Sequence, residues 1–135
     1  MIEPNIYQWF DQSVARHESR IAISCNGRQQ SYGELAESCN RIANFLLANK
    51  VPQGSLIGVL TQDIFNAIAA ILGALKARCA FVPLDPALPA KRMAAVFDQM
   101  PLNCVVTDAA QLPTLRGLEE KGIHARIICV DNLDL

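Results

Sequence analysis

Four short apolar runs alternate with helical segments in the second half of the chain. The clearest is Leu56-Ile57-Gly58-Val59-Leu60, a continuous apolar run of the kind expected for a strand buried on both faces of a sheet. The other three runs are Ala80–Pro83, Cys104–Val106 and Arg126–Val130. Strands that are separated by helices pair in parallel through right-handed crossovers. The pattern therefore predicts an α/β fold with a mostly parallel sheet and helices on both of its faces.

The first half of the chain predicts a helix, a β-hairpin and a capped helix in front of that sheet. Ile6 to Arg16 has helical spacing. Asn26-Gly27 is a strong signal for a two-residue turn, and it would join strands at Arg20–Ser24 and Arg28–Ser31. Ser31-Tyr32-Gly33-Glu34 fits a capping box, in which the Ser31 hydroxyl and the Glu34 carboxylate each accept a backbone N–H at the start of a helix.

Apolar stripes predict which faces of the helices are buried. In the first helix the stripe consists of Ile6, Trp9, Phe10 and Val14. In the capped helix it consists of Leu35, Cys39, Ile42, Ala43, Leu46 and Leu47. The segment Ile64–Ala77 is apolar nearly all round, which indicates burial on more than one side. Two further helices are expected, one with Pro89 at its first position and one over Leu112–Lys121.

Length and composition predict one cytoplasmic domain that spans residues 1–135. The net charge of −1 gives no electrostatic reason to expect binding to nucleic acid or to an anionic membrane. The longest apolar stretch, around Ile64–Leu75, is interrupted by Asn66 and Gly73 and is too short to span a bilayer. No signal peptide is recognisable. The five cysteines form no C-x-x-C pair, which is typical of small buried side chains in a reducing compartment.

A parallel sheet of this kind raises the question of a nucleotide site, and the sequence argues against one. Neither G-x-G-x-x-G nor G-x-x-x-x-G-K-[ST] occurs in the chain. Glycines that are dispersed cannot bring several backbone amides together on one phosphate. Gly27, Gly54 and Gly122 instead fit turns or a helix end.

The residue types that carry nucleophilic or metal chemistry do not converge either. His17 and His124 lie in polar, turn-like segments without an assignable partner, and Ser38-Cys39 lies on an amphipathic helix rather than at a strand-to-helix elbow. The acidic residues near the end are expected to be solvated, namely Glu119 and Glu120 at a helix end and Asp131 and Asp134 in a polar tail. Two histidines and scattered cysteines make no metal set. We therefore expect no catalytic, cofactor-binding or metal-ligating residue in this chain.

Lys76 and Arg78 are the basic residues closest to a predicted strand end, where a phosphate could bind. They also mark the last turn of the apolar helix, where cations interact favourably with the helix dipole. Anions are attracted to the opposite end of a helix. We therefore expect a structural role for both residues.

Two motifs and the spacing between them resemble one known family. Ser31-Tyr32-Gly33-Glu34-Leu35 is similar to an early (T/S)YxEL motif, with Gln30 in place of the leading apolar residue. Leu75–Asp85 resembles an LKAGxAYVPLD segment, and Asp85–Arg92 matches its DPxxPxxR continuation. Thr107-Asp108 after an apolar strand also fits. The family is that of the amino-acid adenylation domains of nonribosomal peptide synthetases, within the adenylate-forming, AMP-binding ligases, and the resemblance covers about residues 6–130.

The resemblance implies a parent enzyme that activates an amino acid with ATP and Mg²⁺ as an aminoacyl adenylate. That enzyme then passes the acyl group to the thiol of a carrier protein. This chain would be the first part of its N-terminal subdomain, since the family's phosphate loop, specificity pocket, hinge and mobile lysine all lie further along. The implied partners are the remainder of the adenylation domain and a carrier protein. The chain alone would then hold no cofactor and be inactive.

Two alternatives remain open, and one departure from the family pattern affects the geometry. The chain could belong to an acyl-CoA or acyl-AMP ligase, or be a non-catalytic interaction or scaffold domain that keeps half of the fold. If the chain is a fragment of a ligase, the apolar helix and the sheet edges would lack their later partners, and self-association is expected. Arg78-Cys79 stands where the family usually has Gly-Gly. Either the backbone is not left-handed there, or the join between helix and strand differs locally.

Overall fold

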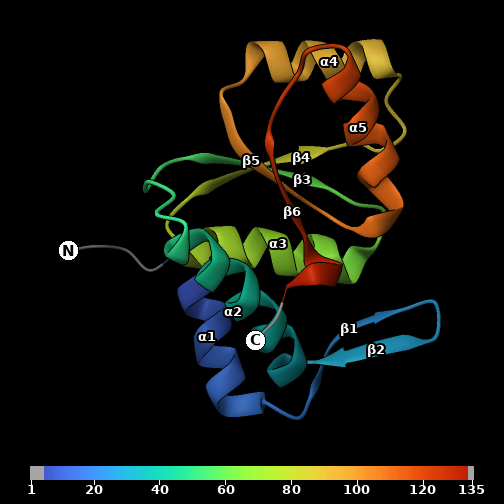
Figure 1. Cartoon of the computed structure of the whole chain (residues 1–135). Coiled ribbons are helices and arrows are strands. Elements are labelled where there is room, and N and C mark those ends of the chain that lie inside the picture. Colours follow the sequence, from blue (N-terminus) through green and yellow to red (C-terminus); the bar gives the residue numbers. More distant parts are fainter. Residues whose placement is uncertain (1–4, 134–135) are drawn as a thin grey trace.

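The computed structural model describes residues 5–133, and its centre is a four-stranded parallel sheet (Figure 1). The strand order is β4-β3-β5-β6, and all three pairings are parallel. The elements in chain order are α1 (Ile6–His17), β1 (Ile21–Cys25), β2 (Arg28–Ser31), α2 (Tyr32–Ala48), β3 (Leu56–Leu60), α3 (Ile64–Lys76), β4 (Ala80–Leu84), α4 (Ala90–Gln99), β5 (Leu102–Thr107), the 3₁₀ turn η1 (Ala109–Gln111), α5 (Leu112–Glu120), β6 (Arg126–Cys129) and the 3₁₀ turn η2 (Val130–Asn132). The predicted order of elements is confirmed. Pro89 lies just before α4 instead of at its first position.

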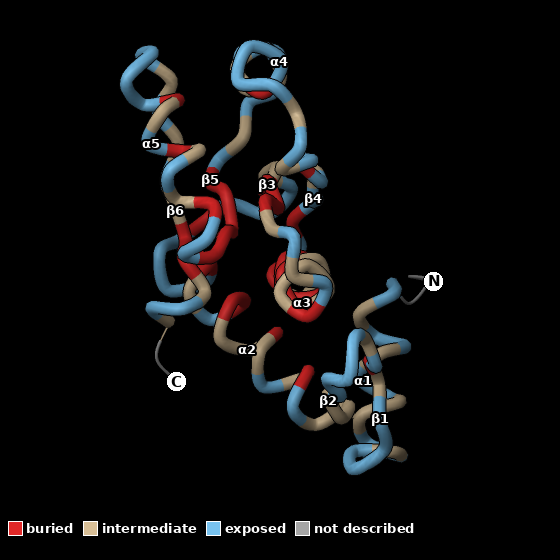
Figure 2. Tube along the Cα trace, turned by 90° about the vertical axis from the view of Figure 1, so that its right-hand side faces the viewer, coloured by how far each residue is buried: buried red, intermediate tan, exposed pale blue. Residues whose placement is uncertain are grey.

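Helices cover both faces of the sheet, as the sequence predicts. Figure 1 shows α3 under one face, with α1 and α2 outside it, and α4 and α5 over the other face. Along β5, Cys104 and Val106 belong to the core shared with α3, whereas Val105 between them belongs to the core shared with α4 and α5. This alternation follows from the two-residue period of a strand. Figure 2 shows that burial concentrates in β3, β5 and the inner sides of α2 and α3.

The hairpin and the capped helix form as predicted. Strands β1 and β2 pair antiparallel, and Asn26 and Gly27 between them have φ angles of 50° and 79°, as a type I′ turn requires. The Glu34 amide donates to the Ser31 hydroxyl, and the Ser31 amide donates to the Glu34 carboxylate, each at 3.1 Å. The hydrogen bond from the Ser31 amide is the main cause of a lowered pKa of Glu34, and the Ser31 hydroxyl adds to it. A second capping box, between Asn5 and Gln8, starts α1. The spacing Asn-x-x-Gln carries the signal for this cap, although the motif was not among those predicted.

Two of the predicted apolar stripes are partly wrong. Ile6 and Trp9 are 61% and 58% exposed, whereas Phe10 packs against the core as predicted, together with Tyr7, which the predicted stripe did not include. In α2, Leu46 is buried but Leu47 is 56% exposed. Neighbouring residues on a helix point about 100° apart, so a narrow contact covers one of them and leaves the next in solvent. Which side is covered depends on the position of the neighbouring helices, which the local pattern does not encode.

Helix α3 is buried on more than one side, and the cover comes from within the chain. The sheet covers one side, and α1 and α2 lie against the other (Figure 1). Ile64, at its N-terminal end, is 45% exposed. Elements of the chain itself thus cover most of this helix, and contact with later parts of a parent and self-association stay predictions that depend mainly on the sheet edges. No helix among residues 5–133 is long and apolar enough to cross a membrane.

The join between α3 and β4 is left-handed at Arg78, whose φ is 61°. Helix α3 ends in a Schellman motif, because the Arg78 amide donates to the Leu75 carbonyl at 3.0 Å and the Cys79 amide donates to the Ala74 carbonyl at 2.9 Å. The first of the two possibilities raised by the sequence, a backbone that is not left-handed here, is therefore wrong. The two hydrogen bonds and the burial of Cys79 hold the arginine in a conformation that favours glycine.

Arg78→Gly is expected to raise the free energy of unfolding by about 1 kcal/mol, because glycine removes the clash of a Cβ atom in the left-handed conformation. Chemical denaturation of the two proteins measures the difference. Arg78→Ala is the matched control. Alanine loses the charge but keeps the Cβ, and we expect it to change stability little. Equal gains in both variants would mean that the charge, and not the backbone conformation, destabilises this join.

Candidate functional site

The carboxyl ends of β3 and β5 form the topological switch point of the sheet. The chain leaves β3 through α3 toward β4, and it leaves the neighbouring β5 through α5 toward β6, on the opposite side. In open α/β sheets, ligands bind outside the carboxyl ends of the strands at such a point. At this edge, the Thr107 hydroxyl donates to the Leu60 carbonyl at 2.7 Å and joins the ends of both strands. The segments that follow are the candidate site of the fold.

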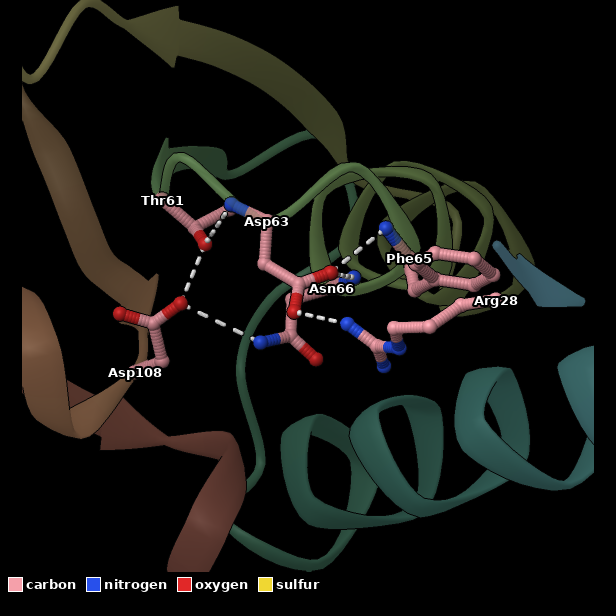
Figure 3. Close-up of polar contacts among 6 residues, drawn as sticks. All are labelled: Arg28, Thr61, Asp63, Phe65, Asn66 and Asp108. Carbon is pink, nitrogen blue, oxygen red and sulfur yellow. Dashed lines mark hydrogen bonds and ion pairs between the residues drawn. The ribbon is translucent and has the colours of Figure 1, made fainter. Parts of the chain in front are cut away.

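Asp108 lies at the centre of this edge and is 7% exposed. Figure 3 shows Thr61 and Asn66 pointing at the same oxygen of its carboxylate. The Thr61 hydroxyl donates to Asp108 Oδ2, and Asn66 Nδ2 donates to the same oxygen at 3.2 Å. The Asp63 amide in turn donates to the Thr61 hydroxyl at 3.0 Å. Side chains of the chain itself therefore occupy the centre of the switch point.

Asp63 caps the N-terminus of α3 beside this network. Its Oδ1 accepts the amides of Phe65 and Asn66 at 2.8 and 3.3 Å, and its Oδ2 accepts Arg28 of the hairpin at 3.0 Å. The Arg28 guanidinium also lies 4.3 Å from the centroid of the Phe65 ring. Partial burial raises the pKa of Asp63, but the hydrogen bonds from Arg28, Asn66 and Phe65 outweigh it, and the net effect lowers the pKa.

This arrangement disfavours a phosphate at the switch point. The N-terminus of a helix is the usual anion site of such folds, and here the Asp63 carboxylate already accepts its amides. The Asp108 carboxylate adds a second negative group close by. A nucleotide phosphate would be repelled by both. Within the described part of the chain, no group of three or more His, Cys, Asp or Glu side chains could hold a metal ion.

A large hollow lies elsewhere. It is a wide groove of about 770 Å³ between the end of α1 and the start of α2. Its lining mixes both signs of charge, with Arg16 and Arg20 against Glu18, Glu34 and Glu37, and it also contains His17. Glu34 is already used in the cap of α2. We assign the candidate site to the switch point, where buried polar side chains converge, rather than to this open groove.

The residues singled out from the sequence do not come together in one place. His124 is exposed and His17 is half-buried. Lys76 donates to Asn40 of α2 and lies 5.5 Å from the centroid of the Tyr7 ring of α1, so it ties three helices together. Its structural role is thus broader than the expected interaction with the helix dipole.

The remaining acidic and sulfur-bearing residues fall in three kinds of place. Glu119 and Glu120 are exposed at the end of α5, as expected. Asp131 is not in a polar tail, because it lies in η2 and its Oδ2 accepts the Ala109 amide at 2.7 Å. Asp134 lies outside the described residues. All five cysteines are free, and Cys39 is fully buried on α2.

Sequence reasoning missed the network of Thr61, Asn66 and Asp108. Part of the signal was present, because Thr61 and Asp108 both follow apolar runs that were predicted as strands. The missing step was strand order, since only the neighbouring positions of β3 and β5 bring these residues together.

The fold and the filled switch point define an open, doubly wound α/β domain. The family model described as AMP-binding enzyme matches residues 10–135, and the chain belongs to this family. Surfactin synthase subunit 2 of Bacillus subtilis (strain 168) is 40% identical over 91 residues, which are 67% of this chain and 2% of that protein. A linear gramicidin synthase of Brevibacillus parabrevis is 32% identical over 129 residues, which are 96% of this chain and again 2% of the relative. The chain thus spans only a small part of these relatives.

Solved structures agree with the fold. The nonribosomal peptide synthetase FmoA3, with α-methyl-L-serine-AMP bound, superposes with a TM-score of 0.81 at 26% identity, over 97% of this chain and 15% of that chain. The N-terminal subdomain of NpsA from Klebsiella oxytoca gives a TM-score of 0.75 at 18% identity, over 96% of this chain and 31% of that chain, and shows likeness of fold alone. The predicted fold, the first part of an adenylate-forming N-terminal subdomain, is confirmed.

Proposed function

We propose that these residues are the first part of an adenylation domain in a cytoplasmic nonribosomal peptide synthetase. The parent enzyme activates an amino acid with ATP as an aminoacyl adenylate and loads it on the thiol of a carrier protein. ATP and Mg²⁺ are then bound by residues beyond the described part of the chain. Residues 1–135 act as scaffold: they build one sheet, its covering helices and the hairpin, and supply no catalytic group.

The likeness to the linear gramicidin synthase, 32% identity over 96% of the chain, carries this proposal. The filled switch point supports the scaffold role, because carboxylates rather than phosphate-binding amides occupy it. Catalysis of adenylation requires donors that stabilise negative charge developing on phosphate. The geometry at Asp63 and Asp108 has the opposite electrostatic sign.

Pyrophosphate exchange into ATP tests the proposal. The complete adenylation domain, expressed from the full gene, is expected to show exchange that depends on one amino acid or a few similar ones. Residues 1–135 alone are expected to show none with any amino acid. Turnover by the purified short chain would contradict the scaffold role.

The same assay separates the alternatives. Exchange by the complete protein with carboxylic acids that lack an amino group, together with formation of a coenzyme A thioester, would identify an acyl-CoA ligase. No exchange with any acid would favour a non-catalytic scaffold. The anthranilate CoA ligase AuaEII, whose structure superposes with a TM-score of 0.84 at 14% identity, shows that the fold alone does not distinguish these classes.

A further inference from the structure

Asp108 makes an unusual use of its carboxylate. One oxygen accepts two hydrogen bonds, whereas the other, Oδ1, is buried and has no partner. Neither of the two ion pairs found among residues 5–133 includes Asp108. Burial of a carboxylate without a cation and with an unpaired oxygen is unfavourable. A gain in stability therefore does not explain why a carboxylate is present at Asp108. The explanation has to come from the two side chains that donate to it, Thr61 and Asn66.

Those two groups are the start of a continuous series of contacts. Asp108 holds Thr61, whose hydroxyl accepts the Asp63 amide at 3.0 Å. The Asp63 carboxylate accepts Arg28 at 3.0 Å, and Arg28 is the first residue of β2. Figure 3 shows the series from the end of β5 to the hairpin in one view. Asp108 and Arg28 lie at its two ends and share no hydrogen bond or ion pair.

The outer end of the hairpin has few contacts besides this series: the Arg28 guanidinium lies over the Phe65 ring, and Cys25 packs against the core. Arg28 and Gln29 are exposed, and the buried residue of the hairpin is Ile23 on β1. Figure 1 shows the hairpin as an arm that projects beside the N-terminal end of α3. A loop or arm with few buried apolar contacts opens locally at low free energy. Its direction then depends on the contacts of Arg28, with the Asp63 carboxylate and with the Phe65 ring.

We propose that Asp108 is a positioning residue that fixes the β1–β2 hairpin against the carboxyl edge of the sheet, acting through Thr61, Asp63 and Arg28. It holds the loop after β3 in one conformation, and that conformation aims the Asp63 carboxylate at the hairpin. A contiguous series of contacts can carry such coupling, and these four residues form one: its hydrogen bonds enter Asp63 at the amide and leave it at the carboxylate.

Hydrogen exchange of backbone amides in the folded chain tests this role. Asp108→Ala is expected to raise the exchange rates of the hairpin amides about tenfold. The amides of β3 and β5 exchange through global unfolding, and their rates should change only as much as the overall stability of the variant does. Asp108→Asn keeps an oxygen that can accept from Thr61 and Asn66, and it should leave the hairpin rates near those of the original protein. Thr61→Val breaks the series at its second member and should reproduce the effect if Asp108→Ala does not fold.

Asp131→Ala is the matched control, since it removes a carboxylate from the same edge whose hydrogen bonds within residues 5–133 come from the Ala109 amide and the Cys129 thiol. It should leave the hairpin unchanged. A double-mutant cycle between Arg28→Ala and Asp108→Ala should show non-additive effects on hairpin exchange, although the two side chains do not touch. Additive effects, unchanged hairpin rates in both Asp108→Ala and Thr61→Val, or an equal response to Asp131→Ala would overturn the proposal.

Discussion

Gly73→Ala is expected to lower the free energy of unfolding by about 2 kcal/mol, although alanine is the better helix former. Helices α2 and α3 lie in close contact at this glycine. A Cβ atom there would lie 2.9 Å from the Cβ and Cγ2 atoms of Ile42 and 3.0 Å from the Cys39 carbonyl oxygen. Ile42 is 2% exposed and Cys39 is fully buried, so neither can move aside. The cost of overpacking outweighs the gain of about 1 kcal/mol in helix propensity.

Gly117→Ala, the same substitution at another helical glycine, is expected to change the free energy of unfolding in the opposite direction. Gly117 lies inside α5, and a Cβ atom there would meet nothing within 4 Å. Alanine should therefore raise stability by about 0.5–1 kcal/mol through helix propensity alone. Urea denaturation of both variants measures the contrast. If Gly73→Ala stabilised the chain as Gly117→Ala does, the close approach of α2 and α3 would be wrong.

The sequence predicted those features that depend on local periodicity and local capping. The apolar run Leu56–Leu60 needs only its composition to indicate a buried strand, and Asn26-Gly27 needs only its backbone freedom to indicate a turn. Gly73 shows the limit of this reasoning. Gly73 and Gly117 both lie inside helices, and the sequence does not show that only Gly73 meets a close neighbour, Ile42. Contacts between elements set that constraint.

The candidate site was less predictable than the fold for the same reason. From the local sequence, Asp108 is only a polar residue that follows a strand. Its hydrogen bond with Thr61 forms because β3 and β5 are neighbours in the sheet. Arg78 illustrates a different failure. The preference of the left-handed conformation for glycine is worth about 1 kcal/mol, and two hydrogen bonds with a buried Cys79 outweigh it. A local preference of this size does not decide a join that tertiary contacts hold.

The thiols of Cys39 and Cys104 are expected to resist alkylation in the folded chain by a factor of about 100 to 1,000. Burial raises the pKa of Cys39 from 9.0 to about 12, against a small opposing effect of Lys76, and burial together with Cys79 raises the pKa of Cys104 to about 11. Only the thiolate reacts. At pH 8 the thiolate fraction falls from roughly one in ten at the ordinary pKa to about one in a thousand or less. Iodoacetamide labelling followed by peptide mass spectrometry measures each site, with the half-buried Cys25 as the internal reference.

The raised pKa of Cys39 also makes the free energy of unfolding decrease as pH rises in the alkaline range. The folded chain holds the Cys39 proton more tightly than the unfolded chain does, so this contribution is fully present below pH 9 and is lost as pH rises toward about 12. The loss approaches about 1.4 kcal/mol per pH unit within that window. Cys39→Ala removes the titrating group, and its free energy of unfolding should fall less steeply with pH, even though the small cavity lowers its absolute value. Parallel pH profiles of the two proteins, or labelling of Cys39 as fast as Cys25, would mean that α2 opens readily from α3. The close contact between α2 and α3, on which the prediction for Gly73→Ala depends, would then also be contradicted.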